Sequence, residues 1–133
     1  MTYKNGLSFG FEELEVYRLA REFRKRVYRL AMLLPTDEKF GLRQQMQTAA
    51  VSITNNIAEG HGRFNWQDNT KFCRNARGSL CEVVDDINVC LDEGYAKPKH
   101  LADLKQDAMR LLKVLNGYIG YLQKQKTLEQ KER

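Results

Sequence analysis

The sequence predicts an all-α protein, an antiparallel up-down-up-down four-helix bundle formed by a single domain. Apolar residues recur every three or four positions in four long segments, which is the spacing of one face of an α-helix. The two prolines, Pro35 and Pro98, fall between these segments, and no segment alternates apolar and polar residues as a strand does. Short connections between such helices make consecutive helices antiparallel neighbours.

The first helix is expected over about 11–34 and the second begins soon after Pro35. Thr36 is the predicted N-cap of the second helix, with Asp37 and Glu38 in its first turn, where carboxylates favour the positive end of the helix dipole. The predicted core face of the first helix is Val16, Leu19, Ala20, Phe23, Val27, Leu30, Ala31 and Leu34. That of the second is Leu42, Met46, Ala49, Ala50, Ile53 and Ile57.

The third helix is expected to open after Asn65 and to end at Gly94, which supplies a left-handed stop. Its predicted core face is Phe72, Ala76, Leu80, Val83, Val84, Ile87 and Leu91, with Cys73 and Cys90 on the same side. The fourth helix follows Pro98 with Leu101, Leu104, Ala108, Leu111, Leu115, Tyr118 and Leu122 in a heptad-like seam.

The domain organisation follows from these helices. Residues 1–10 are expected to form an N-terminal extension and residues 11–123 the four-helix bundle. Residues 124–133 are almost entirely polar and cannot offset the entropy cost of ordering by burial. A disordered C-terminal tail is therefore predicted.

The composition limits the class of protein and its location. Lys and Arg number 22 against 17 Asp and Glu, a formal charge of +5 that allows an anionic partner but also serves solubility alone. The sequence has no signal-like start and no stretch of about 18 apolar residues, so we expect a cytoplasmic protein without membrane contact. Cys73, Cys81 and Cys90 have no zinc-site spacing and are expected to be reduced, structural thiols.

No catalytic residue, cofactor site or metal site is predicted. The two histidines, His61 and His100, have no histidine partner four positions away and are interpreted as loop or surface residues. The glycine-rich stretch 60–63 lacks the strand-led context of a phosphate-binding loop and is interpreted as a helix-capping loop. Four carboxylates are interpreted as surface charge: Asp85, Asp86, Asp92 and Glu93.

A basic ridge on the first helix is the first feature with a functional interpretation. Its four residues lie within about 80° of one another on the helical wheel, opposite the apolar stripe: Arg18, Arg21, Lys25 and Arg29. Such a ridge suits contacts with nucleic-acid phosphates, each cation releasing a counterion. An ordinary solvated face, partly neutralised by Glu22, is the alternative.

The second and third helices carry two more unusual patterns. From Gln44 to Ala58 the second helix has no charge, which suits either a subunit interface or a central helix covered within one bundle. In the third helix Lys71, Arg74 and Arg77 precede the carboxylates, the reverse of what the helix dipole favours. Ion pairs between helices or between subunits would explain that order.

The sequence also resembles a known family at specific motifs. They are Phe40-Gly41-Leu42, Gln45-Met46, Ala49-Ala50, Ser52-Ile53, Asn56-Ile57-Ala58-Glu59-Gly60 and Gly62-Arg63, continued by Phe72, Ala76, Gly78-Ser79 and Glu82 and preceded by Phe11, Leu14, Val16 and Tyr17. With these residues the chain resembles the bacterial four-helix-bundle proteins encoded by intervening sequences within large-subunit rRNA genes. That family is related to the accessory variability determinant of diversity-generating retroelements.

The resemblance implies a ring-like homo-oligomer, a pentamer, with a basic surface for nucleic acid and a partner such as a reverse transcriptase. It implies structural roles for five motif residues: Asn56 and Glu59 as a polar lock at the end of the second helix, Gly78 and Ser79 at close helix packing, and Gly60 as part of the same structural motif. The family often has basic residues where this chain has Gln47 and Thr48.

The predicted function is therefore a non-enzymatic homo-oligomer that binds RNA or DNA through Arg18, Arg21, Lys25, Arg29, Arg63, Lys71, Arg74 and Arg77. The first alternative is a protein-protein adaptor that holds a partner enzyme without touching nucleic acid. The second is an enzyme whose site is built between subunits, which the small number of histidines disfavours.

Overall fold

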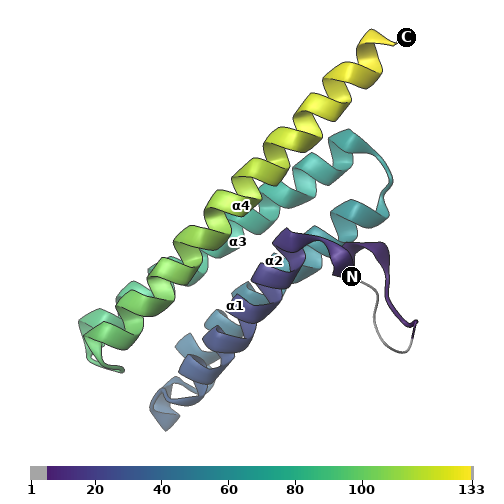
Figure 1. Cartoon of the computed structure of the whole chain (residues 1–133). Helices are drawn as coiled ribbons and strands as arrows, with labels where there is room; N and C mark the ends of the chain where they lie inside the picture. Colours follow the sequence, from purple (N-terminus) through teal and green to yellow (C-terminus); the bar gives the residue numbers. More distant parts are fainter. Residues whose placement is uncertain (1–5, 133) are drawn as a thin grey trace.

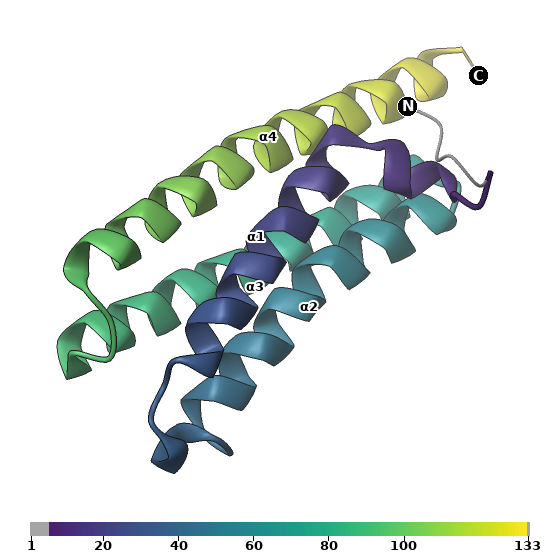
Figure 2. The same ribbon diagram turned by 60° about the horizontal axis from the view of Figure 1, so that its bottom comes forward.

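A computed structural model describes residues 6–132 and contains four α-helices (Figure 1). They are α1 (Glu15–Met32), α2 (Leu42–Gly62), α3 (Trp66–Glu93) and α4 (Pro98–Lys131), with two short 3₁₀ helices, η1 (Gly10–Glu13) and η2 (Thr36–Glu38). Consecutive helices run antiparallel, and α1 and α3 each pack against both α2 and α4 (Figure 2). No Cα atom of α1 lies within 8 Å of one of α3, and the same holds for α2 and α4, so these two pairs are diagonal across the bundle. The predicted up-down-up-down bundle is confirmed.

The core lies between the apolar faces of the four helices, as the periodicity predicts. All six core residues predicted for α2 are buried, and Cys73 and Cys90 are buried as predicted, whereas Cys81 is exposed. Burial raises the pKa of the Cys73 thiol to about 12. Leu91, a predicted core residue, is 46% exposed, because Cys90 takes the inward position in the last turn of α3. Four more predicted core residues are only half-buried: Leu19, Phe72, Val84 and Tyr118.

The start of the bundle differs from the predicted boundary at residue 11. Gly10 already belongs to η1, which contacts α1 and α2, and Leu14 then adopts an extended conformation (φ −70°, ψ 133°) that separates η1 from α1. The single predicted helix over 11–34 is therefore two elements. Of the predicted N-terminal extension, residues 1–5 lie outside the described residues, as does residue 133.

The predicted N-cap at Thr36 is also wrong. Thr36 begins η2, and α2 begins only at Leu42, after Gly41 has broken the helical path (φ −112°, ψ −109°). A carboxylate nevertheless accepts a hydrogen bond at the start of α2, since the Leu42 amide donates to Oε1 of Glu38 at 3.3 Å. The other oxygen of Glu38 accepts a hydrogen bond from the Tyr95 hydroxyl at 2.8 Å, which ties this connection to the end of α3.

Both ends of α3 are confirmed. Oδ1 of Asn65 accepts the backbone N–H of Asp68 at 3.0 Å, which makes Asn65 the N-cap. Gly94 ends the helix in the left-handed region, with φ of 69°.

The predicted disordered tail is corrected, because α4 continues to Lys131 and its last turns extend past the start of α3 (Figure 1). Two physical reasons account for this. Once a helix exists, each added residue gains a backbone hydrogen bond without a new nucleation cost, and Lys, Gln, Leu and Glu are good helix formers. Gln125 and Lys126 are also half-buried, so the segment is not fully solvated.

Candidate nucleic-acid interface

The predicted basic ridge lies on the outer side of α1. Lys25 and Arg29 are exposed, and Arg18 and Arg21 are half-buried. Lys25 pairs with Glu22 at 3.3 Å, an exposed pair of small energetic value. Among residues 6–132, the other three ridge side chains make no ion pair.

Two further arginines of α1 explain why the ridge projects outward. Arg24 donates through Nη1 to Oγ1 of Thr54 on α2 at 2.8 Å, and Arg26 pairs with Asp107 on α4. These contacts fix the two flanks of α1 to its neighbours. The ridge therefore occupies the remaining, solvent-facing side of the helix.

The four cations predicted from 63 onward lie elsewhere. Arg63 pairs with Glu59 at 3.3 Å and covers the Phe72 ring at 5.0 Å, and Arg77 donates to Oδ1 of Asn116 at 2.9 Å. Lys71 and Arg74 line a hollow between α3 and α4. Since α3 lies diagonally across the bundle from α1, its three cations, Lys71, Arg74 and Arg77, do not share one surface with the ridge, and the prediction of a single surface is wrong for them.

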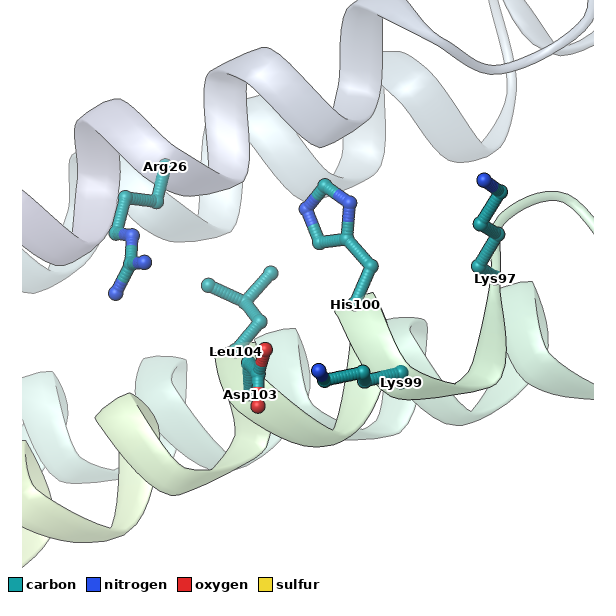
Figure 3. A pocket seen from close by; sticks show the side chains of 6 residues that line it. All are labelled: Arg26, Lys97, Lys99, His100, Asp103 and Leu104. Carbon is teal, nitrogen blue, oxygen red and sulfur yellow. The ribbon is translucent and has the colours of Figure 1, made fainter.

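A third group of cations lies beside the ridge. A cleft of about 390 Å³ between α1 and the start of α4 is lined by Arg26, Lys97, Lys99, His100, Asp103 and Leu104 (Figure 3). The His100 side chain points toward α1, and the first turn of α4 has no carboxylate to offset the positive end of its dipole. Arg26 and Arg29 are neighbours on the helix surface, so the cleft continues the ridge.

Sequence reasoning missed Lys97 and Lys99 as candidate binding residues. The available signal was a pair of lysines on either side of Pro98, at a helix start without Asp or Glu. His100 is exposed as predicted, whereas His61 is half-buried within α2 and is not a loop residue. The whole stretch 60–62 is helical, so the predicted capping loop is also wrong.

The family-like motif residues serve packing between α2 and α3, with two exceptions. A Cβ atom added to Gly60 would lie 2.8 Å from Oδ1 of Asn69 and 2.9 Å from Cβ of Phe72, so only glycine fits this contact without a shift. Nδ2 of Asn56 donates to the carbonyl of Ser52 at 2.8 Å, and the hydroxyls of Ser52 and Ser79 are 2.8 Å apart.

The two exceptions are Glu59 and Gly78. Glu59 is exposed and pairs only with Arg63 on its own helix, so it forms no lock between helices. A Cβ atom added to Gly78 would meet nothing within 4 Å, so close packing inside this chain does not explain that glycine.

Asp86 is not surface charge, which corrects the prediction for this residue. It is 1% exposed and accepts a hydrogen bond from Nε2 of Gln45 at 2.8 Å, while its Oδ2 has no partner among the described residues. Burial, with repulsion from Glu82 and Asp85, raises the pKa of Asp86 to about 6. Its partner is a neutral amide on α2, so the predicted ion pair does not form at this position.

The uncharged outer side of α2 is open to solvent in the single chain. Gln44, Thr48 and Asn55 are exposed. Together with Tyr28 and Val51 they line a shallow hollow of about 430 Å³. Of the two alternatives for this face, a covered central helix is excluded.

Within residues 6–132, no helix is both long and apolar enough to cross a bilayer. In the same range, Asp, Glu, His and Cys side chains do not gather in groups of three or more that could hold a metal ion.

The fold and its charge pattern define a class: an all-α four-helix bundle with a basic outer helix and a basic cleft beside it. Residues 12–117 match the 23S rRNA-intervening sequence protein family, and the chain belongs to that family. The family resemblance is thus confirmed.

A solved structure shares the fold. It is a protein of unknown function from the S23 ribosomal protein family of Bacteroides thetaiotaomicron, determined by crystallography at 1.70 Å resolution. The TM-score is 0.72 at 20% identity, over 78% of this chain and 97% of that one. No curated protein shows significant similarity to this chain.

Proposed function

We propose that this protein binds RNA or DNA through the basic ridge on α1 and catalyses no reaction. The ridge itself is the observation that supports the proposal, since only Lys25 of its four cations has a carboxylate partner among the described residues. Cations without local partners are available to phosphates, and each contact gains free energy by releasing a counterion.

Binding of this kind is independent of base sequence. The ridge consists of long flexible cations on the outside of one helix, and contacts to phosphates position a nucleic acid without reading its bases. Lys97 and Lys99 in the adjoining cleft extend the same positive surface.

The test is binding of a generic structured RNA over a salt series, with the parent protein and the Arg21→Glu/Lys25→Glu variant. We expect the parent to lose affinity steeply as salt rises. The variant should bind at least about tenfold more weakly and show a salt slope smaller by about 2, because each lost phosphate contact removes about 1 from the slope.

A matched control is the Lys113→Glu/Lys124→Glu variant, which makes the same change in net charge at exposed positions of α4. If the ridge is the site, this control keeps most of the affinity. Equal losses in both variants would show that net charge alone attracts RNA, and absence of binding by the parent at low salt would overturn the proposal.

We also propose that the protein is a homo-oligomer. The family resemblance implies that the oligomer is a pentamer. The exposed, uncharged outer side of α2 supports a homo-oligomer, because interface cores are depleted of charged residues. Thr48→Arg should lower the mass measured by light scattering, whereas Gln106→Arg, at an exposed position of α4, should not. An unchanged mass in Thr48→Arg would place any interface elsewhere.

The same face of α2 favours one alternative function, a protein-protein adaptor without nucleic-acid binding. In that case partner binding would depend only weakly on salt, and Thr48→Arg would weaken it while Arg21→Glu/Lys25→Glu would not. A reverse transcriptase as the partner and a cytoplasmic location stay predictions.

A further inference from the structure

A group of aromatic side chains lies at the end of the bundle where α2 turns into α3. They line a cleft of about 360 Å³ and come from three places: Phe64 in the turn, Trp66 at the start of α3, and Tyr118 and Tyr121 on α4. Trp66 meets Tyr121 edge to face with ring centroids 6.3 Å apart, and Tyr118 stacks on Tyr121 at 6.2 Å. Phe64 is 89% exposed and Tyr121 50%, so aromatic surface is open to a ligand.

This aromatic cleft is continuous with a polar groove. A second hollow shares Phe64 and Trp66 with the cleft and adds Lys126 and Gln130 of α4. A third hollow, of about 600 Å³, shares Lys126 and Gln130 and extends along α3 to Lys71 and Arg74. We call the three connected hollows the end groove. It runs from aromatic rings at one end to cations at the other.

The turn that presents Phe64 is strained. Phe64 has φ of 51°, a left-handed conformation that a bulky residue rarely adopts. Its amide donates to the carbonyl of His61 at 3.3 Å, and its ring meets the His61 ring with centroids 6.2 Å apart. A strained backbone conformation costs free energy. Such strain clusters at ligand-binding sites, where it holds a side chain in position for a ligand.

The charges in the end groove favour a ligand that binds by stacking on the rings over one that is held by charge alone. Lys71, Arg74 and Lys126 line it, and so do the carboxylates Asp68 and Glu129. The positive excess is therefore small compared with that of the ridge. Aromatic platforms beside a few cations are how proteins bind single-stranded nucleic acid, each stacked base contributing about 1–3 kcal/mol.

We propose that the end groove binds single-stranded RNA or DNA, with an unpaired base stacked on the ring of Tyr121 or Phe64 and the neighbouring phosphates near Lys126 and Lys71. This inference rests on the proposed nucleic-acid function and adds a second site with a different preference. A duplex keeps its bases stacked on one another, so it should use the ridge and leave the end groove empty.

The chain has one tryptophan, Trp66, and it lines both the cleft and the second hollow, so its fluorescence reports on the groove. The probes are an oligoadenylate of about 12 nucleotides and a duplex of the same length, at low salt. We expect the oligoadenylate to quench Trp66 and the duplex to leave it unchanged. Affinity for the single strand should fall less steeply with salt than affinity for the duplex.

Three variants separate stacking from folding. Tyr121→Leu should weaken oligoadenylate binding about tenfold and leave duplex binding unchanged. Phe64→Asn should also weaken it but melt no lower than the parent, because Asn tolerates a positive φ. Phe40→Leu is the matched control, since Phe40 is 82% exposed near the start of α2, away from the groove, and should bind like the parent.

Each contrary outcome has a distinct meaning. If the oligoadenylate binds without affecting Trp66, or Tyr121→Leu binds it normally, the end groove is not the site while the ridge proposal stands. If neither probe binds at low salt, the proposed function fails as well. If Trp66 fluorescence changes with protein concentration alone, a second copy of the chain covers the groove and the inference is overturned.

Discussion

Asn69 and Asp86 are polar side chains buried near opposite ends of α3, and their environments differ. Near the start, Asn69 is 6% exposed and uses both ends of its amide: Nδ2 donates to the Tyr118 hydroxyl at 3.3 Å and Oδ1 accepts from the Cys73 thiol at 3.5 Å. Near the end, Asp86 is 1% exposed, has one amide partner and leaves Oδ2 without one among the described residues.

Burial of a polar side chain and satisfaction of its hydrogen-bonding groups are therefore separate properties. A neutral amide with partners at both ends costs little to bury and does not respond to pH. Burying a carboxylate with one neutral partner costs folding free energy, and protonation of the carboxylate removes most of that cost. Of these two sites, only the Asp86 end of α3 should therefore make the stability of the protein depend on pH.

The largest expected effect comes from Asp86→Asn. The pKa of Asp86 lies near 6 in the folded protein against an ordinary value of 3.8, so the folded state binds this proton more tightly than the unfolded state does. The resulting stabilisation is complete below about pH 4 and is lost as the pH rises through 6. This difference in pKa corresponds to about 3 kcal/mol, so the variant should remove most of that amount from the difference in unfolding free energy between pH 4 and pH 8.

Urea denaturation at the two pH values measures this effect. Asp92→Asn is the matched control, because Asp92 is exposed on the same helix and is not one of the carboxylates that raise the pKa of Asp86, so it should keep the pH dependence of the parent. An Asp86→Asn protein with the same pH dependence as the parent would mean that the buried carboxylate is not the titrating group.

Gly60→Ala tests how tightly the Asn69 end is packed. The added methyl group would approach Asn69 and Phe72 to less than 3.0 Å, so we expect a loss of about 2 kcal/mol in unfolding free energy from overpacking. Gly78→Ala, on α3 with open space around its Cβ, should gain up to about 1 kcal/mol from helix propensity. Equal effects of the two substitutions in thermal denaturation would contradict the packing role of Gly60.

The smallest expected effect is that of Asn69→Asp, which makes the start of α3 resemble its end. The Tyr118 hydroxyl can still donate to the new carboxylate, so the unfolding free energy at pH 8 should fall by only about 1 kcal/mol. Burial should raise the pKa of the new carboxyl group, and the cost should therefore shrink as the pH falls toward 4. A cost that is the same at both pH values would show that geometry and not charge distinguishes Asn69 from Asp86.

Periodicity in the sequence predicts most of the fold. The spacing of apolar residues identifies the core faces of α1, α2 and α4, and the chemistry of Asn65 and Gly94 predicts the ends of α3. The failures lie where long-range contacts decide. Asp86 looks like any exposed Asp on a helix, and only the packing of α2 against α3, with Gln45 opposite, buries it.

The candidate site was predictable only in part. The ridge is local to one helix, so its four cations are placed correctly by helical angles alone. Whether Lys71, Arg74 and Arg77 join it depends on which helices are neighbours, and α3 turns out to be diagonal to α1. The end groove combines a turn, the start of α3 and the last turns of α4, which are far apart in the sequence.

The sequence by itself determined the class of fold, the core faces and the basic ridge, because each depends on the regular geometry of one helix. Only the tertiary structure decided the partners of Asp86, the exposure of the outer side of α2, the extension of α4 to Lys131 and the joining of aromatic and cationic side chains in the end groove. These features depend on which side chains from distant segments come into contact, and no local pattern encodes that.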